Sequence, residues 1–308
     1  MTGRNRNFLG DFVPEWCALA ALALADALLA AHAHINFAPT PGAYWLIPPL
    51  LVAAFFVRQR FSRLGLALDY CALLVAADTA IRVLTYVTSA LAGPLWDAQF
   101  AAMDRALGFD WIAYFHFVVD HPQIGAVLGF LYYRIGLIAV GFFVLMCWRA
   151  NKGRMREIFW LLLTASVLTA IIAQMLPVLG PFHAYGLAES CGPFVLELER
   201  LRAGLHPAFP LGSLQGVVQC PSFHTTLALG LVYAFRGMGM TAKTINILCV
   251  MILFGVPVFG GHYLVDMIGG ALVLAMSLAV TKAAPLAARK LIAGYALPGS
   301  AARYGDAY

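Results

Sequence analysis

The chain has 308 residues, of which 62% are hydrophobic and only 11% are charged, against about 25% charged residues in ordinary soluble domains. Its net charge is +5, and the basic residues fall in short clusters between apolar runs rather than in one continuous stripe. This composition excludes a soluble enzyme, a disordered tail and a collagen-like chain, and it does not indicate a nucleic-acid partner. The sequence therefore predicts an all-α polytopic protein embedded in the lipid bilayer.

Apolar runs long enough to cross a bilayer recur along the chain. A transmembrane helix needs about 20 mostly apolar residues. We expect eight such helices, at Trp16–Asn36, Ala43–Val57, Leu64–Leu91, Gln123–Trp148, Glu157–Leu179, Ser222–Phe235, Thr244–Phe259 and His262–Thr281. The second is the weakest of these predictions because it is short and contains two prolines.

Lysine and arginine mark every second connection between the predicted helices. These residues are Arg4, Arg6, Arg58, Arg60, Arg63, Arg149, Lys152, Arg154, Arg156, Arg236, Lys243, Lys282, Arg289 and Lys290. Because basic connections stay in the cytoplasm, we expect both termini there, in a bacterial inner membrane, and the other connections on the periplasmic side. As an alternative, the first predicted helix is a signal peptide cleaved near residues 31–33, which leaves the remaining topology unchanged.

Two of the external connections are too long to be simple turns. Trp96–Asp120 mixes aromatic and charged residues, which is typical of one or two helices lying in the membrane interface. Gly180–Pro221 carries several charges and prolines, and structureless loops of this length are uncommon unless they cover a site. A solvated loop is the alternative, but we favour a lid because of the motif at its end.

Two histidine motifs open predicted helices on the external side, at residues 220–226 (CPSFHTT) and 260–266 (GGHYLVD). His262 and Asp266 are four residues apart and share one helix face. The carboxylate can orient the imidazole and leave its other nitrogen free as a nucleophile. Ser222 and the free N–H groups at helix starts can bind an anion. Two histidines beside an anion site suit phosphoryl transfer, in which one attacks phosphorus and the other protonates the leaving oxygen.

These residues resemble the motifs of the type 2 phosphatidic acid phosphatase (PAP2) superfamily. Its second motif, Pro-Ser-x-His, is matched by Pro221, Ser222 and His224, and its third ends in His-x-x-x-Asp, matched by His262 and Asp266. The resemblance implies that His262 is the nucleophile and forms a phosphohistidine, with Asp266 as its orienting partner. It also implies that His224 is the general acid and that Ser222 binds phosphate.

The resemblance further implies a six-helix core. We therefore divide the chain into an N-terminal two-helix membrane extension (1–63), a PAP2-like catalytic core (64–281) and a cytoplasmic tail (282–308). A magnesium site needs several oxygen ligands together, and the predicted mouth offers little besides Asp266. We expect no metal and no other cofactor.

The chain departs from the superfamily at its first motif, Lys-x6-Arg-Pro. Residues 174–183 (QMLPVLGPFH) stand there without either cation, and the Ser-Arg that begins the third motif is replaced within residues 256–259. The phrase PSFHT followed by GGHYLVD is similar to the inositol phosphorylceramide synthase branch of inositolphosphotransferases, which pass a phospho-head group between lipids. We expect such a transferase with a phospholipid or sphingolipid substrate. A lipid-phosphate phosphatase that uses water is the alternative, and a transporter or scaffold with this fold is a third reading.

A phosphate dianion needs positive charge in its transition state, so other cations must replace those of the first motif. Arg134, inside the fourth predicted helix, is one candidate, with pairing between helices as the alternative reading. His183, in the long external loop, is the other, with a merely solvated histidine as its alternative.

Cysteine positions give one further expectation. Cys191 and Cys220 are the only cysteines in the predicted external segments, and both lie in the long loop. If that compartment is oxidising, a disulfide between them can persist. The alternative is two unpaired thiols whose Cα atoms lie more than about 7 Å apart.

Overall fold

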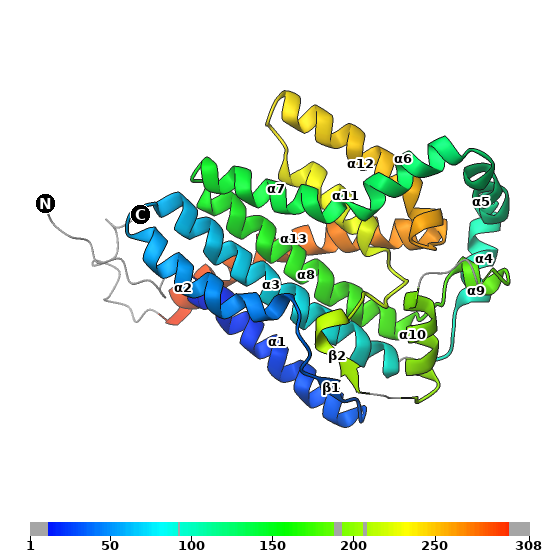
Figure 1. Ribbon diagram of the computed structural model, residues 1–308, viewed down its shortest axis with the longest axis horizontal. Coiled ribbons are helices and arrows are strands. Elements are labelled where there is room, and N and C mark those ends of the chain that lie inside the picture. Colours follow the sequence, from blue (N-terminus) through cyan, green and yellow to red (C-terminus); the bar gives the residue numbers. More distant parts are fainter. Residues whose placement is uncertain (1–11, 92, 188–192, 206–207, 296–308) are drawn as a thin grey trace, which may run out of the picture.

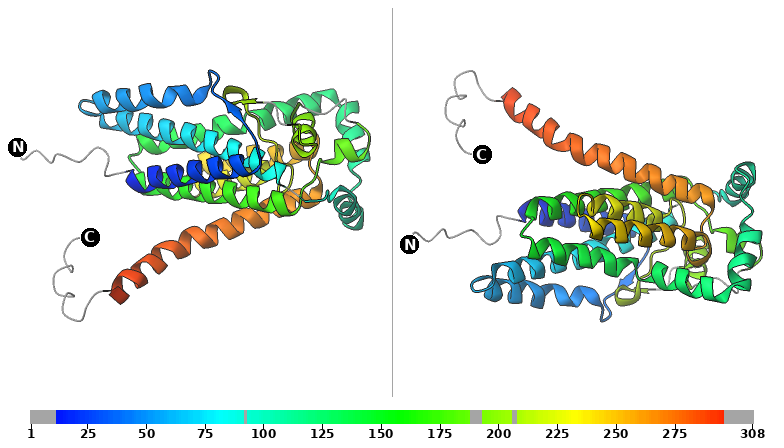
Figure 2. Two further views of the ribbon diagram at one scale, coloured as in Figure 1. Left: turned by 90° about the horizontal axis from the view of Figure 1, so that it is seen from below. Right: turned by 90° about the horizontal axis from the view of Figure 1, so that it is seen from above.

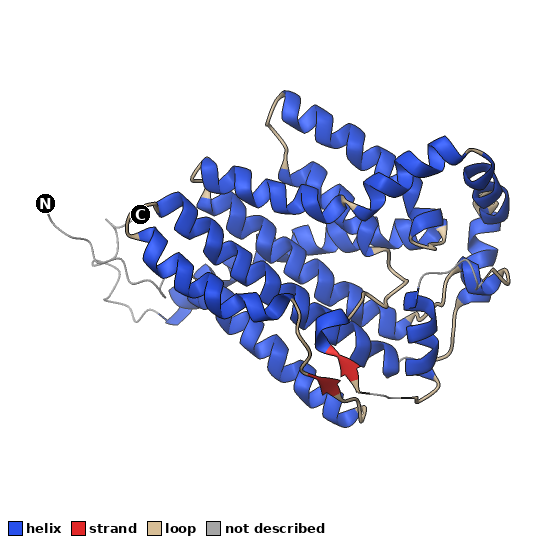
Figure 3. Cartoon of the chain, viewed as in Figure 1, coloured by secondary structure: helices blue, strands red, loops and turns tan. Residues whose placement is uncertain are grey.

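The computed structural model describes residues 12–91, 93–187, 193–205 and 208–295. Helices form most of this part of the chain (Figures 1 and 3). Two short strands, β1 (Phe37–Ala38) and β2 (Phe209–Pro210), pair in parallel. The predicted all-α membrane fold is confirmed in these residues.

The bundle is built from the apolar segments that the sequence indicates. Within the described residues, five helices are long and apolar enough to cross a membrane: α1 (Val13–His32), α3 (Ser62–Ala90), α8 (Lys152–Met175), α12 (Met240–Phe259) and the part of α13 (Leu264–Tyr295) up to Ala283. Helices α6 (Pro122–Tyr133) and α7 (Ile135–Trp148) are apolar enough together to make a sixth if the bent pair is one span. Two shorter apolar helices are α2 (Ile47–Arg58), after the 3-10 turn Ala43–Leu46, and α11 (Phe223–Ala234). In the part of the chain that the structure describes, all eight predicted segments are helical, but only five of them, or six with the bent pair, are long and apolar enough to cross a membrane.

The fourth predicted helix is broken, which the sequence did not indicate. Its halves, α6 and α7, meet at Arg134 with a bend of 45°. The backbone N–H of Arg134 donates to the carbonyl of Leu131, three residues back, and the N–H of Leu137 donates to the carbonyl of Arg134 in the same way. Such a tightened turn interrupts the regular ladder of hydrogen bonds and lets the helix change direction.

The N-terminal helices α1 and α2 pack against α3 and are also held by ion pairs. The carboxylate of Glu15 in α1 is fully buried and accepts from Arg156 Nε of α8 at 2.6 Å. Arg58, at the end of α2, pairs with the buried Asp69 of α3. A buried charge is costly unless it is paired, so these two contacts fix how the N-terminal helices sit on the bundle.

The two ends of the bundle differ in what they carry. The start of α1 and the end of α13 lie at one end (Figure 2). Turns with basic residues meet there too: Arg154 donates to the carbonyl of Arg236, and Arg63 lies over the ring of Trp148. The opposite end carries the short helices α4 (Asp97–Ala106), α5 (Trp111–Asp120), α9 (Pro181–Ala184) and α10 (Pro193–Arg202).

The external segment predicted as a lid is fastened to the N-terminal helices. The β1–β2 ladder joins the connection after α1 to this segment. The hydroxyl of Tyr86 in α3 donates to Glu197 of α10 at 2.6 Å, and Arg82 donates to the carbonyl of Leu214 at 2.7 Å. In its described residues the segment therefore contains helices α9 and α10 and is held against α3 and the connection after α1.

Candidate active site

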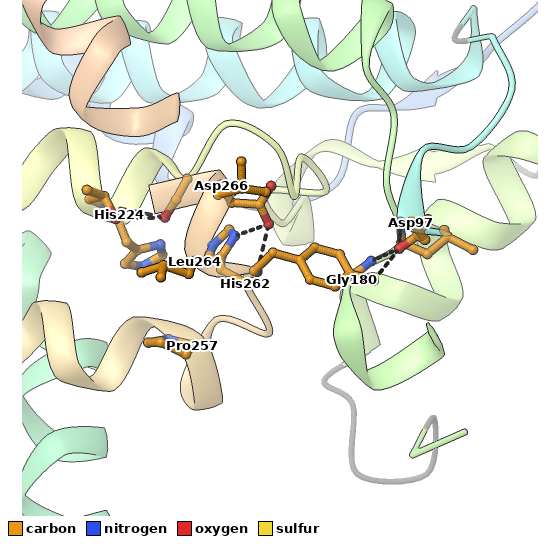
Figure 4. A network of polar contacts seen from close by, with 12 residues as sticks. Asp97, Gly180, His224, Pro257, His262, Leu264 and Asp266 are labelled. Atoms are coloured by element: carbon orange, nitrogen blue, oxygen red, sulfur yellow. Dashed lines mark hydrogen bonds and ion pairs between the residues drawn. The ribbon is translucent and has the colours of Figure 1, made fainter. Parts of the chain in front are cut away.

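The two histidine motifs meet where α11 and α13 begin (Figure 4). The backbone N–H of Ser222 donates to the backbone carbonyl of Asp266 at 3.0 Å. A Cβ on Gly270 of α13 would lie 2.4 Å from the carbonyl oxygen of Ser222, so only glycine permits this approach. The helix crossing thus brings together two motifs about 40 residues apart in sequence, on the same end of the bundle, as the alternation of basic connections predicted.

His262 and Asp266 form the first pair of the site. His262 Nδ1 lies 3.7 Å from Asp266 Oδ2, and both side chains are buried. This is an ion-pair distance and longer than a hydrogen bond, and such catalytic contacts often tighten when substrate binds. The same Oδ2 accepts from the backbone N–H of Tyr263 at 2.9 Å, which fixes the carboxylate on the first turn of α13. Nδ1 faces the carboxylate, so Nε2 is the nitrogen left for a substrate.

Local chain geometry sets the direction of His262. Helix α12 contains Pro257 and ends at Phe259, after which Gly261 has φ +60° and a Cβ there would lie 2.8 Å from the ring of Phe182. The carbonyl of Pro257 accepts both from the backbone N–H of His262 at 3.2 Å and from the indole of Trp111 at 3.1 Å. A left-handed glycine and a buried tryptophan of α5 therefore hold the histidine loop in place.

His224 and Tyr132 form the second pair. Tyr132, on α6, is buried, and its hydroxyl lies 3.1 Å from His224 Nδ1. The two rings are stacked with their centroids 4.2 Å apart and an angle of 19° between their planes. A Cβ on Gly260 would lie 2.7 Å from the Tyr132 hydroxyl and 2.5 Å from the ring of His262. Gly260 therefore packs directly against Tyr132 and His262, and a larger residue there would clash with both.

Two aspartates of α4 bind the backbone around the histidine loop. Asp104 is buried and accepts from the N–H groups of Leu264 and Val265 at 2.8 and 2.9 Å, so it caps the start of α13. Burial raises the pKa of the Asp104 carboxyl, while these two N–H groups act in the opposite direction. An anion at a helix N-terminus also interacts favourably with the helix dipole. The free N–H groups that we expected to bind a phosphate at this helix are thus already occupied by a carboxylate.

Asp97, seven residues earlier on α4, holds the segment that stands in place of the first PAP2 motif. It accepts from the N–H groups of Leu179 and Gly180 at 3.0 and 2.8 Å, and from the hydroxyl of Tyr263 at 3.2 Å (Figure 4). Burial, with the charge of Asp97 as a second cause, raises the pKa of the Tyr263 phenol. Helix α4 therefore connects Leu179 and Gly180 to Tyr263, the residue that follows His262.

The structure places the remaining predicted residues differently. Ser222 is fully buried as the N-cap of α11, where its hydroxyl accepts from the backbone N–H and the hydroxyl of Thr225. Arg134 is exposed and lies over the ring of Phe130. His183 is 41% exposed, with Nε2 3.5 Å from Glu199 of α10. The structure places Ser222, two residues before His224, against the backbone of Asp266, and it places Arg134 and His183 in these other contacts.

The predicted disulfide falls partly outside the described residues. Cys191 is one of the residues that the structure does not describe, whereas Cys220 is buried and has a free thiol. Burial raises the pKa of this thiol, and the negative charge of Asp266 adds to the shift. The bridge between them stays a prediction.

An apolar cavity lies against the histidine loop. It has a volume of about 290 Å³. Its lining includes Tyr114 of α5, Val250, Leu253 and Phe254 of α12, and Leu264 and Met267 of α13. Leu264 is two residues beyond His262 and Met267 directly follows Asp266, so one wall of this cavity is formed by the same first turn of α13 that carries Asp266.

Three residues of the site, Tyr132, Asp97 and Asp104, were given no role from the sequence. Asp97 and Asp104 carry a weak signal, because a spacing of seven residues places both carboxylates on one face of a helix. Tyr132 carries none: it is one aromatic residue among many in an apolar helix, and only the bend at Arg134 and the crossing of α11 bring it to His224.

One known family matches most of the chain that carries this site. A sequence profile described as PAP2 superfamily matches residues 98–280, which is more than half of the chain and runs from α4 into α13. The chain belongs to the PAP2 superfamily. Helices α1 to α3 lie before the matched part. No curated protein and no solved structure matches the chain significantly.

Proposed function

We propose that this PAP2-superfamily protein is an integral membrane phosphotransferase that acts on lipid phospho-head groups through a phosphohistidine, in the manner of an inositol phosphorylceramide synthase. The observation that carries the proposal is the convergence of two histidines with different partners, Asp266 for His262 and Tyr132 for His224. Superfamily membership supports phosphatase or phosphotransferase chemistry in general, and the finer assignment rests on the site.

In the first half-reaction, Nε2 of His262 attacks the phosphorus of the donor lipid. The P–N bond forms while the bond from phosphorus to the leaving oxygen breaks, and His224 gives that oxygen a proton. The carboxylate of Asp266 stabilises the positive charge that develops on the imidazole of His262, as an electrostatic partner in a site with little water. The side chains of His262 and Asp266 are nearly inaccessible to solvent, which strengthens this interaction.

In the second half-reaction, an acceptor hydroxyl attacks the phosphohistidine. His224, now neutral, takes the proton of that hydroxyl while the P–N bond breaks and a new P–O bond forms. One residue thus serves as acid and then as base. The burial of His262 and Asp266 under the external helices supports an acceptor that enters from the membrane in preference to bulk water.

The apolar cavity beside the loop supports a lipid substrate. Its walls expose almost only carbon atoms, and it lies next to Leu264 and Met267, which flank the polar site on α13. A hydrocarbon chain that enters this cavity leaves water, which is favourable by roughly 25 cal/mol per Å² of apolar surface. A chain anchored there would bring the attached phosphate towards the mouth of α13.

The site is proposed to open on the periplasmic side of a bacterial inner membrane. The basic turns gather at the end of the bundle away from the histidines, and basic connections stay in the cytoplasm. In sealed right-side-out vesicles, a cysteine introduced at Gly186 should react with an impermeant thiol reagent and one at Gly153 should not. Labelling in the reverse pattern would overturn the orientation.

The reaction is tested with purified protein and a phospholipid labelled in its phosphate, with and without candidate alcohol acceptors. We expect the label to appear in a new phospholipid only when the acceptor alcohol is present. Release of free phosphate alone, at a rate that acceptors do not change, would identify the alternative activity, a lipid-phosphate phosphatase. The His262→Ala variant is the negative control for both measurements, label in a new phospholipid and release of free phosphate.

A further inference from the structure

The side chain of Tyr132 is the partner of His224 Nδ1. Its hydroxyl lies 3.1 Å from that nitrogen, its ring stacks on the imidazole at 4.2 Å, and the residue is only 5% exposed. This contact joins α6 to α11, two helices that are far apart in sequence. A hydrogen bond that uses Nδ1 leaves Nε2 as the only nitrogen of His224 available to a substrate.

We propose that Tyr132 is a positioning residue that accepts a hydrogen bond from Nδ1–H of His224 throughout the reaction, so that only Nε2 exchanges protons with substrates. The inference rests on the proposed function, because it assigns the acid–base nitrogen of that reaction. The distance alone is compatible with either direction of the hydrogen bond, and the proton balance of the two half-reactions decides between them.

In the first half-reaction, His224 begins as an imidazolium with protons on both nitrogens, and Nδ1–H donates to the phenol oxygen of Tyr132. Nε2 gives its proton to the leaving oxygen as the bond from phosphorus to that oxygen breaks. His224 is then neutral, with its remaining proton on Nδ1 and a free electron pair on Nε2.

In the second half-reaction Nε2 takes the proton of the acceptor hydroxyl, which restores the imidazolium. If Tyr132 instead donated to Nδ1, the neutral imidazole would carry its proton on Nε2. It could not then act as a base towards the acceptor. Only the phenol oxygen as an acceptor lets one nitrogen serve both half-reactions.

A neutral phenol beside His224 affects release of its proton differently from a carboxylate. A carboxylate beside His224 would hold the imidazolium and oppose release of its proton, as Asp266 does for His262. The hydroxyl of Tyr132 orients the ring without adding a full charge. His262 of the α12–α13 loop is a titratable neighbour whose charge acts on His224.

The test uses two phosphate esters that transfer the same group, one with an alkyl alcohol and one with 4-nitrophenol as the leaving group. An alkoxide needs a proton to leave, whereas 4-nitrophenolate does not. In Tyr132→Phe the ring still stacks on His224 but the hydroxyl is absent. We expect phosphoenzyme formation from the alkyl ester to fall by about 10- to 100-fold, a part of the usual effect of an acid catalyst, while formation from the nitrophenyl ester stays within about twofold.

The matched control is Tyr133→Phe, which removes a hydroxyl from the adjacent residue, 69% exposed, and should change neither rate. Equal losses with both esters in Tyr132→Phe would show that Tyr132 acts only through packing and would overturn the proposal. No change with either ester would overturn it too.

A second measurement is independent of the variant and of turnover. The nitrogen chemical shifts of ¹⁵N-labelled histidine in the wild-type protein in detergent, with His224 assigned by comparison with His224→Ala, report which nitrogen carries the proton. We expect Nδ1 to stay protonated in both charge states while Nε2 titrates. A neutral His224 protonated on Nε2 would contradict the proposal even if the enzyme transfers phosphate, and a site without phosphotransferase activity would contradict the proposed function while leaving this result readable.

Discussion

His224 lies in the first turn of α11 and His262 lies two residues before α13, at the same end of the bundle, but their surroundings differ in one respect. His262 Nδ1 faces the carboxylate of Asp266, whereas His224 Nδ1 faces the neutral hydroxyl of Tyr132. A carboxylate favours the charged imidazole and makes the distant nitrogen a better nucleophile, while a phenol orients the ring and leaves its proton free to move. Two identical side chains can therefore take the roles of nucleophile and acid because their second nitrogens have different partners.

Removing each histidine in turn should separate these two roles. His262→Ala should abolish phosphoenzyme formation from every ester, a loss of several powers of ten, because no other group supplies the nucleophile. His224→Ala should abolish transfer from an alkyl ester but retain much of the first step from a nitrophenyl ester. Rapid-quench measurement of the labelled phosphoenzyme checks both. If both variants lost phosphoenzyme formation from the nitrophenyl ester to the same extent, the division of roles between His262 and His224 would be contradicted.

Removing the negative charge of Asp266 beside His262 should have the next largest effect on kcat. Asp266→Asn keeps the size of the side chain but removes the charge that stabilises the imidazolium and can reverse the tautomer, so we expect kcat to fall by about 10²- to 10⁴-fold. The control is Asp78→Asn, which alters an exposed ion pair with Arg82 and should leave kcat unchanged, since such pairs contribute little. A kcat within threefold of wild type in Asp266→Asn would show that the carboxylate does not assist His262.

A smaller effect on kcat is expected from changing Asp104, the aspartate that caps the start of α13. Asp104→Asn leaves one of the N–H groups of Leu264 and Val265 facing the amide N–H₂, and an unsatisfied buried donor costs about 1–3 kcal/mol. We expect a lower unfolding temperature in detergent and a fall in kcat of roughly tenfold, since the start of the helix that carries Asp266 loosens. The exposed Asp120→Asn is the control. An unchanged unfolding temperature would mean that the cap does not stabilise this end of α13.

Several features of the fold and the site follow from the sequence because they depend on local pattern. The apolar runs indicate the positions of the membrane helices, and the alternation of basic turns alone places both histidine motifs at one end of the bundle. The sequence predicted His262 near Asp266 from a spacing of four residues on one helix; the contact is present, but His262 lies in the loop two residues before α13 begins. In each case the residues concerned are neighbours in the chain or share a simple period.

The contacts that the sequence did not reveal join residues far apart in the chain. Tyr132 reaches His224 across 92 positions, and Asp104 reaches Leu264 across 160. These contacts are set by how α4, α6, α11 and α13 cross, which no local period encodes. Arg134 was selected for its charge, but the bend at that residue points Tyr132 to the site while the guanidinium lies over Phe130.

The location of the covalent phosphate decides which histidine is the nucleophile. Purified protein is mixed with a donor lipid labelled in its phosphate, quenched within milliseconds under conditions that preserve phosphohistidine, and digested for mass spectrometry. We predict that the label is on His262, bonded to Nε2, because Nδ1 faces Asp266. Label on His224, on Nδ1 of His262, or on a residue other than histidine would contradict this assignment of roles.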